Sequence, residues 1–371
     1  MKFSIEKSTL LRSLQYVNKA TPTRSTLPIL SCVLFEVRKN NLMIRTTSLE
    51  VYISLTVNIE ESENGKIAVP LHTLLDITNA MPEEFLHFQI SDIGKVNITS
   101  TCGKYTIMGQ SADEFPAEPV VEKGNSLTLL SSELNSIINQ TIYATSKDEL
   151  KPVLQGVLIN MNSNGLTSVA TDGHRLVKYI KNNLTSSSFD GKVIVPVKFL
   201  SLIKPLLSEE GKISLQIGEN YVMVEINGIK ISSRIIKDRY PDYDSVIPKN
   251  NENELKIDRN ILLASVKRVA IFSNRSTKQI ALSLSENKVL ISTEDPENIT
   301  TGKETVDCEY SGEPMVIGYN AQYLGDVLKN QSTDRIKIML NSPLNAAIFL
   351  PEENKDDESI TTLLMPIRLN D

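Results

Sequence analysis

Short runs that alternate apolar and polar residues recur along the chain, and each is followed by apolar residues at helical spacing. Phe3-Ser4-Ile5 precedes such a segment near the start, and Leu127-Thr128-Leu129 and Leu255-Lys256-Ile257 precede similar segments later. Alternation with a period of two predicts a half-buried strand, whereas apolar residues three and four apart predict the buried face of a helix. Ser and Asp residues between the two parts are typical helix caps. The pattern therefore predicts the same strand-then-helix opening three times.

The similarity continues downstream at a spacing of about 125 residues, close to a common domain size. Gly65–Pro70 (GKIAVP) returns as Gly191–Pro196 (GKVIVP), while Val316–Asn320 fills the same place in a more diverged third copy. Three Xaa-Pro pairs mark the ends of the copies: Phe115-Pro116, Tyr240-Pro241 and Met365-Pro366. This period is too long for solenoid repeats, so it predicts whole domains in tandem at residues 1–121, 122–247 and 248–371. Val120–Asn125 and Pro248–Glu254 suit linkers between them.

Each copy contains few helices and many strands. The predicted helices run over 8–20, 71–80, 131–144, 196–207, 259–272 and 320–330. Strand-like segments include 33–37, 157–161, 212–217 and 221–226, the last two joined by a Gly-Glu-Asn turn. This order predicts the α+β class, with two helices of each copy covering one face of antiparallel sheet.

The charge of the chain is acidic overall, with 39 Lys and Arg against 45 Asp and Glu and a net charge of -6. The predicted helices lean the other way. Their basic residues are Arg12, Lys19, Lys198, Lys204, Arg259, Lys267, Arg268 and Lys329, and their acidic residues are Asp76, Glu133 and Asp326. Helices gathered on one side of an assembly would attract a polyanion there. A sampling accident on such small numbers explains the bias equally well.

Short motifs for catalysis or metal binding are missing from the sequence. His72, His87 and His174 are not spaced for a metal, no Cys-x-x-Cys or Gly-x-Ser-x-Gly occurs, and no Gly-Lys pair is followed by Ser or Thr. We therefore expect no cofactor and no catalysis. Cys32, Cys102 and Cys308 are odd in number and far apart, which fits a reducing cytoplasm. No run approaches the roughly 18 apolar residues of a spanning helix, so no membrane is expected.

Several short segments, in order along the whole chain, resemble the bacterial DNA polymerase III beta subunit family. They are Thr26–Leu30 (TLPIL), Asp113–Pro116 (DEFP), Val169–Leu176 (VATDGHRL), Tyr240–Tyr243 (YPDY), Ile271–Asn274 (IFSN) and Leu364–Leu369 (LMPIRL). The resemblance implies a sliding clamp, in which two protomers of three domains each associate head to tail as a homodimer and form a ring around duplex DNA. Its two different end surfaces would meet in a heterologous contact that closes. By resemblance, Tyr105 and Ile107 lie at one end and Ile271 and Phe272 at the other.

The resemblance also implies a pocket for short peptides of the replicative polymerase, the clamp loader and repair proteins. The matching residues are Leu154, Thr171, Gly173, His174, Arg175, Leu176, Pro241, Val246, Asn320, Tyr323, Leu344, Leu363, Met365, Pro366, Ile367 and Arg368. Aliphatic walls, one flexible methionine and a few polar groups suit a peptide groove. Ser245, Thr277 and Ala346 depart from the family pattern at its rim.

Contacts to double-stranded DNA are implied at Arg24, before Thr26, and at Lys147 and Lys151 in a loop of the second copy, and the helix lysine Lys198 is expected to face the DNA. Pro152 and Val153 replace a tyrosine pair of some relatives, so base stacking is not expected there. A mildly positive lining would hold DNA without reading its sequence.

Two other functions stay open on the sequence. A hydrolase or transferase could use a cleft around Asp172 and His174, although no nucleophile is visible beside them. A repeat scaffold unrelated to DNA would share the three copies but would not be retained on circular DNA.

Overall fold

A computed structural model describes residues 1–121, 125–182, 184, 188–354 and 356–369. Residues 122–124, within the first predicted linker, lie outside the described residues. The chain divides into two compact units. Unit 1 contains Met1–Ser131 and Ser201–Ile235, and unit 2 contains Ser132–Leu200 and Ile236–Asp371.

The helices follow the predicted positions closely. They are α1 (Lys7–Val17), α2 (Leu71–Ala80), α3 (Ser131–Thr141), α4 (Val197–Ile203), α5 (Arg259–Ala270) and α6 (Ala321–Lys329). Short 3-10 turns are η1 (Asn18–Ala20), η2 (Pro28–Ser31), η3 (Ala112–Glu114), η4 (Ile142–Ala144), η5 (Pro152–Gln155), η6 (Lys204–Leu206) and η7 (Asp244–Val246). The predicted helices are confirmed, and the last turn of three of them is a 3-10 turn. Such tightening is common where a helix ends.

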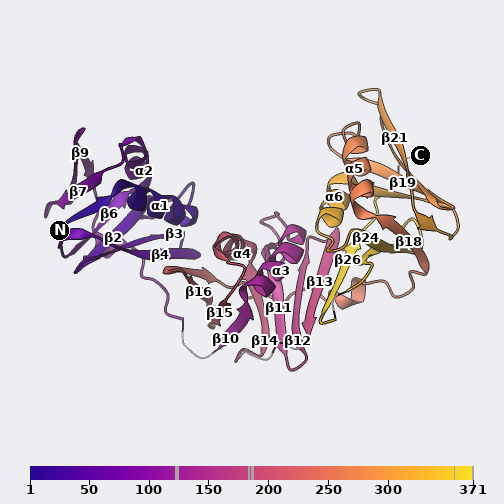
Figure 1. Ribbon diagram of the computed structural model, residues 1–371, viewed down its shortest axis with the longest axis horizontal. Coiled ribbons are helices and arrows are strands. Elements are labelled where there is room, and N and C mark those ends of the chain that lie inside the picture. The colour runs from indigo at the N-terminus through magenta and orange to yellow at the C-terminus, as the bar shows by residue number, and fades with distance from the viewer. Residues whose placement is uncertain (122–124, 183, 185–187, 355, 370–371) are drawn as a thin grey trace. The chain divides into compact units, whose positions relative to one another are not determined.

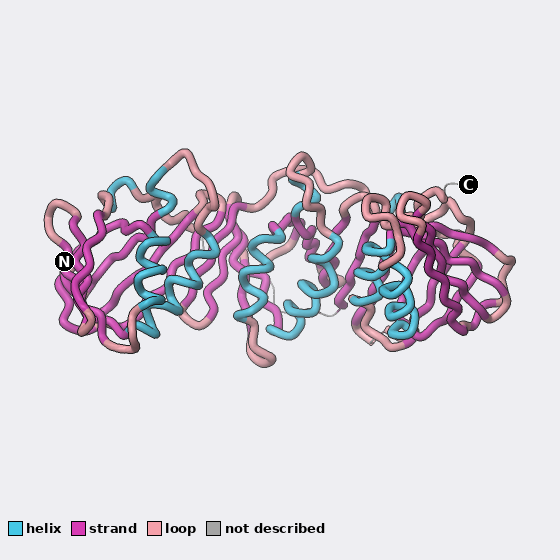
Figure 2. Tube along the Cα trace, turned by 90° about the horizontal axis from the view of Figure 1, so that it is seen from above, coloured by secondary structure: helices cyan, strands magenta, loops and turns pink. Residues whose placement is uncertain are grey.

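In the described part of unit 1, two antiparallel sheets are present. One has the order β5 (Glu60–Glu63), β1 (Lys2–Glu6), β7 (Phe85–Ile90), β8 (Lys95–Ser100) and β9 (Gly103–Met108). The other has the order β10 (Ser126–Leu130), β15 (Lys212–Ile217), β16 (Tyr221–Ile226), β17 (Ile229–Arg234), β4 (Val51–Asn58), β3 (Asn41–Thr47), β2 (Cys32–Arg38) and β6 (Gly65–Pro70). Helices α1 and α2 lie side by side in the part of the chain near the N-terminus (Figure 2). Helix α1 packs against β3 and β4.

In the described part of unit 2, two further antiparallel sheets are present. The larger has the order β14 (Gly191–Pro196), β11 (Gly156–Asn162), β12 (Gly165–Thr171), β13 (Arg175–Asn182), β26 (Glu358–Leu364), β25 (Ala347–Pro351), β24 (Arg335–Leu340), β18 (Asn253–Asp258) and β22 (Glu309–Tyr310). The smaller has the order β21 (Thr300–Asp307), β20 (Lys288–Asp295), β19 (Gln279–Ser285) and β23 (Met315–Asn320).

Each unit joins two of the predicted copies through one strand pair. We call the antiparallel pairing of β4 with β17 in unit 1 the first seam, and that of β13 with β26 in unit 2 the second seam. Strands β13 and β26 run next to each other in Figure 1. Because main-chain hydrogen bonds cross both seams, each large sheet is continuous from one copy into the next.

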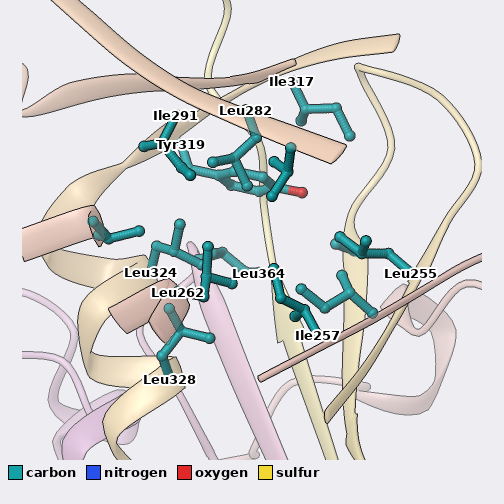
Figure 3. Packing of buried hydrophobic residues seen from close by; sticks show 14 of the residues in the cluster. Leu255, Ile257, Leu262, Leu282, Ile291, Ile317, Tyr319, Leu324, Leu328 and Leu364 are labelled. Carbon is teal, nitrogen blue, oxygen red and sulfur yellow. The ribbon is translucent and has the colours of Figure 1, made fainter. Parts of the chain in front are cut away.

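Amphipathic helices build the cores on the sheets. The buried residues of α5 are Leu262, Ser265, Val266 and Val269, at the three- and four-residue spacing of one helix face. The Asp258 carboxylate accepts a hydrogen bond from the Ile261 amide and so caps this helix. Helices α5 and α6 pack together, and Figure 3 shows their leucines against side chains of the two sheets of unit 2. Leu364 of β26 is fully buried in this core, which therefore reaches the second seam.

Candidate functional site

A cavity of about 520 Å³ lies in unit 2 beside the second seam. Its walls come from the ends of β12, β13 and β26, from η5 and from the loops at 241–248 and 344–346, and they are mostly apolar. The lining residues are Leu154, Thr171, Gly173, Arg175, Leu176, Pro241, Asp242, Tyr243, Val246, Pro248, Leu344, Asn345, Ala346, Leu363 and Met365. An apolar cavity with a few polar groups at defined positions is suited to a small molecule or to the side chains of a peptide.

The structure brings most of the predicted pocket residues to this cavity. Leu154, Thr171, Gly173, Arg175, Leu176, Pro241, Val246, Leu344, Leu363 and Met365 all line it. Leu176 and Leu363 are buried in its floor and face each other across the second seam. Val246, Leu344 and Met365 remain 54%, 68% and 41% exposed. Three large apolar side chains at the mouth are therefore open to an incoming partner.

The other predicted pocket residues form a group next to the cavity without lining it. The His174 ring stacks on Tyr323 of α6, with ring centroids 5.6 Å apart. Asn320 caps α6 by accepting hydrogen bonds from the Gln322 and Tyr323 amides. The chain end passes this group, since the Met365 amide donates to the His174 carbonyl at 2.8 Å and the Ile367 amide donates to Gly318. Pro366 is partly buried and Arg368 is exposed.

Four lining residues were missed by the pocket prediction: Asp242, Tyr243, Pro248 and Asn345. Ala346, expected at the rim, also lines the cavity. Asp242 and Tyr243 belong to the YPDY segment, whose Pro241 was predicted, so their position in the sequence could have indicated them. Asn345 and Ala346 are on a loop whose place beside β26 depends on distant pairing. The Asn251 amide side chain holds that loop by donating to the carbonyls of Ala346 and Met339, each at 2.9 Å.

A tight turn at residues 171–175 shapes one wall of the cavity. Gly173 adopts a φ of 92°, in the left-handed region that favours glycine. The Thr171 hydroxyl donates to the Arg175 carbonyl at 2.7 Å and accepts from the Gly173 amide at 3.1 Å. Asp172 Oδ1 accepts from the amides of His174 and Arg175 at 2.9 and 3.0 Å. This network fixes where β13 begins and where Arg175 points.

Arg175 is a buried cation that joins several elements of the site. Its side chain is 8% exposed, and its Nε donates to Asp172 Oδ2 at 3.1 Å, while its Nη1 donates to Asp326 Oδ2 of α6 at 2.7 Å. The guanidinium lies over the Tyr323 ring at 4.7 Å and near the Tyr143 ring at 5.4 Å. Two carboxylates and two aromatic faces therefore compensate the burial of this charge.

Several tyrosines around the site are harder to ionise than a free phenol. Burial raises the pKa of Tyr143, beside Arg175, well above its ordinary value. Burial likewise raises the pKa of Tyr240, whose hydroxyl donates to the Val169 carbonyl, and the pKa of the cavity-lining Tyr243. These phenols are packing groups that stay neutral at physiological pH, and the Tyr240 hydroxyl is also a hydrogen-bond donor.

The alternative of a reaction centre at Asp172 and His174 finds little geometric support. Both carboxylate oxygens of Asp172 accept hydrogen bonds from the turn and from Arg175. The imidazole of His174 is exposed and packs face to face on Tyr323. A catalytic base needs the proton of its nucleophile within hydrogen-bond reach. The two residues are instead engaged in holding the turn and the aromatic stack.

The residues predicted to face DNA are all exposed. They are Arg24 in unit 1 and Lys147, Lys151 and Lys198 in unit 2. The loop that carries Lys147 and Lys151 is ordered by local bonds, because Asp148 Oδ1 accepts from the Leu150 amide and the Lys151 amide donates to the Asp148 carbonyl. Two of the basic helix residues are paired, Arg259 with Asp334 and Arg268 with Glu304. The positive charge that the helices offer to a polyanion is therefore smaller than the count of their basic residues suggests.

The predicted interface residues lie at two sheet edges. Tyr105 and Ile107 are on β9, the last strand of its sheet in the described part of unit 1; Tyr105 is partly buried and Ile107 is 9% exposed. Ile271 and Phe272 follow α5 and are 76% and 42% exposed. Phe272 is held next to the edge strand β21, since its carbonyl accepts a hydrogen bond from the Thr300 hydroxyl at 3.1 Å.

Comparisons with known proteins agree over the whole chain. Family models of the DNA polymerase III beta subunit match in order: the N-terminal domain at residues 1–119, the central domain at 128–242 and the C-terminal domain at 244–368. The protein named beta sliding clamp of Vibrio cholerae is 32% identical over 371 residues, and that of Pseudomonas putida is 33% identical over 374 residues, each covering 100% of both chains.

Solved structures give the same result for the fold. The DNA polymerase sliding clamp of Pseudomonas aeruginosa, solved with a ligand, superposes with a TM-score of 0.90 at 30% identity and 100% coverage of both chains. Another structure from this organism, described as bound to griselimycin, also gives a TM-score of 0.90 at 30% identity. The three tandem copies and the α+β architecture are thus shared with these proteins.

Proposed function

The chain belongs to the DNA polymerase III beta subunit family, the DNA sliding clamps, and from that premise we propose that two copies close head to tail into a ring around duplex DNA. The ring would tether the replicative polymerase and other DNA-processing proteins and would itself catalyse no reaction. Each copy would contribute three domains, at residues 1–121, 122–247 and 248–371. Free Cys32, Cys102 and Cys308 fit the reducing cytoplasm in which we expect it to act.

The observation that carries the proposal is the repetition of one strand pairing at both seams. In the first seam, β4 is the last of the consecutive strands β2, β3 and β4, and it pairs with β17, the last of β15, β16 and β17. In the second seam, β13 is the last of β11, β12 and β13, and it pairs with β26, the last of β24, β25 and β26. Among the strands that the structure describes, two in equivalent positions have no such partner: β21, the last of β19, β20 and β21, corresponds to β4 and β13, and β9, the last of β7, β8 and β9, corresponds to β17 and β26. In the described residues each ends its own sheet, so a second copy can supply the missing partner.

The apolar side chains at these edges support the same contact. Ile271 and Phe272 are large apolar residues left substantially exposed beside β21, and Tyr105 projects from β9. Exposed apolar groups rimmed by polar residues are typical of protein interfaces. Because the two edges differ, the contact is heterologous and two copies would form two identical seams.

Retention on DNA would be topological. The chain is acidic overall, and its exposed cations include Arg24, Lys147, Lys151 and Lys198. Such a lining attracts phosphates weakly and without sequence preference, so that the ring can slide. Tight electrostatic binding would oppose that movement.

The cavity in unit 2 is the site that we assign to partner peptides. It offers an apolar floor at Leu176 and Leu363 and exposed apolar groups at its mouth. Linear segments of the polymerase, the clamp loader and repair proteins could insert apolar anchor side chains there, as short peptides do in other grooves. His174, Tyr323 and the chain end would extend the surface beside it.

Retention on circular and linear DNA tests the function directly. The protein is loaded by its cognate loader onto nicked circular DNA, and the bound fraction is measured after gel filtration in moderate salt. We expect stable retention on the circle and rapid loss once a restriction enzyme linearises it. Equal retention on both forms would indicate electrostatic binding and would contradict the ring.

A further inference from the structure

The two seams share one register, which can be read from equivalent positions in the three copies. Three ladders start three residues before α2, α4 and α6 and run across their sheets to the edge strand. These ladders are Ala68–Leu34–Arg45–Ser54, Ile194–Leu158–Val169–Lys178 and Gly318–Ala281–Ser292–Lys303. Ser54, Lys178 and Lys303 therefore hold the same position in β4, β13 and β21.

The opposite strands can be aligned in the same way. Three ladders start five residues before α1, α3 and α5: Lys2–Gln89–Asn97–Thr106, Ser126–Gln216–Met223–Ser232 and Glu254–Met339–Ile348–Leu363. Two residues earlier in each edge strand lie Lys104, Lys230 and Thr361. These three residues are thus equivalent in β9, β17 and β26.

Both internal seams pair these equivalent positions with each other. Ser54 is opposite Lys230 in the first seam, and Lys178 is opposite Thr361 in the second. We infer that the seam between two protomers has the same register and places Lys104 of one protomer opposite Lys303 of its partner. The like charges then weaken each of the two seams that close the ring. The inference rests on the proposed head-to-tail pairing of β9 with β21 and adds to it a register and an electrostatic property.

The exposure of the two edge strands agrees with this register. Lys104 on β9 and Lys303 on β21 are both exposed, whereas their neighbours Tyr105 and Gly302 are partly buried on the other face. The register puts Tyr105 opposite Gly302, which has no side chain of its own. A Cβ at Gly302 would lie 3.0 Å from the Phe272 ring, so Phe272 already covers this glycine. The apolar residues predicted for the interface then meet on one face, and the lysines meet on the other.

The internal seams neutralise their lysine, whereas the described surroundings of Lys104 and Lys303 do not. Lys230 forms an ion pair with Glu118 at 2.9 Å, and Lys178 with Asp244 at 2.6 Å, each opposite a hydroxyl residue. Within the described residues neither Lys104 nor Lys303 forms an ion pair. Directly opposed like charges destabilise an antiparallel pair, since their Cβ atoms lie about 5 Å apart.

Charge reversal at each lysine tests the inference through the dimer dissociation constant. Lys104→Glu and Lys303→Glu each convert the like-charge pair into an opposite-charge pair. Because dissociation breaks two seams, we expect each single variant to tighten the dimer by roughly fivefold to twentyfold at low salt. The double variant restores like charges and should return close to the unmodified protein. Lys192→Glu, an exposed lysine on β14, controls for the change in net charge.

Sedimentation equilibrium from nanomolar to micromolar protein gives the dissociation constants, at about 50 mM and about 1 M NaCl, where screening should remove the differences. Single variants whose dimer dissociation constant is not lower than that of the unmodified protein would overturn the register. A protein that stays monomeric in all variants would instead contradict the proposed ring. If circular dichroism shows that a Glu variant misfolds, Lys104→Gln and Lys303→Gln should still tighten the dimer, by a smaller factor.

Discussion

Arg175 Nη1 donates to Asp326 Oδ2 at 2.7 Å, and this bond joins the strand that lines the cavity to helix α6. The same guanidinium binds Asp172 and lies over Tyr323. The arginine therefore couples the shape of the cavity, the second seam and the position of α6. A partner that fills the cavity would therefore contact Arg175, which is also bonded to α6.

Removing Arg175 should destabilise the protein more than removing an exposed arginine. Arg175→Ala leaves Asp172 and Asp326 without their cation and exposes a gap between two aromatic rings, so we expect the free energy of unfolding to fall by about 3 kcal/mol. Urea denaturation followed by circular dichroism measures this change. Arg239→Ala, at an exposed position of unit 2, is the matched control and should change stability by less than about 0.5 kcal/mol. Similar losses in both variants would contradict a special role for Arg175.

Substitution at the cavity mouth should reduce peptide affinity without affecting the fold. Leu344 lines the cavity and is 68% exposed, so Leu344→Glu loses little burial but places a charge where an apolar side chain would bind. We expect at least a tenfold loss of affinity for a polymerase-derived peptide, measured by fluorescence anisotropy. Ile93→Glu, at a similarly exposed position in unit 1, should bind the peptide normally. Unchanged affinity in Leu344→Glu would place the peptide elsewhere.

The secondary structure could be predicted from the sequence because it depends on local periodicity. The strand at Phe3–Ile5 and the helix with Leu262 and Val266 are set by side-chain spacing alone. The seams could not be predicted, since the pairing of β4 with β17 joins segments that are far apart in the sequence. Strand register depends on which faces are buried and on the turns, and neither is known before the sheets are assembled.

The candidate site was predictable only in part for the same reason. Residues in the VATDGHRL segment lie next to one another, so their joint position at one wall follows from the motif. Asp326 was recognised as a helix residue, but its bond to Arg175 requires α6 and β13 to meet. Asn345 reaches the cavity on a loop that Asn251 holds through the Ala346 carbonyl, and no local pattern indicates that contact.

Alkaline pH should weaken unit 1 through Tyr16. Its hydroxyl donates to the Leu202 carbonyl at 3.0 Å, and burial raises the pKa of Tyr16 to about 12. In the unfolded chain the phenol has its ordinary pKa of about 10, so as the pH rises the unfolded state loses this proton before the folded state does. The stabilisation is complete below pH 10 and is lost as the pH rises towards 12. After discounting for partial exposure, the loss is about 1–2 kcal/mol.

Denaturation at several pH values from 8 to about 12 separates Tyr16 from other groups. Tyr16→Phe lacks the ionisable group, so its stability should fall less steeply over this interval than that of the unmodified protein. The two curves should run in parallel below pH 9. Parallel curves over the whole range would show that Tyr16 titrates normally in the folded state.

Dimer formation should depend on the exposed apolar residues that follow α5. Ile271 and Phe272 lie beside the edge strand β21, and they are 76% and 42% exposed in one copy, so charges are tolerated there while the protein is monomeric. In the proposed seam these side chains would be buried against β9, where an unpaired carboxylate costs several kcal/mol. We therefore expect the double variant Ile271→Asp, Phe272→Asp to sediment as a folded monomer at micromolar concentration. Ile261→Asp, on α5 itself and 54% exposed, should remain dimeric. Loss of the dimer in both variants would point to a general effect of added charge on and after α5. A dimer that persists in the double variant would exclude this edge from the contact.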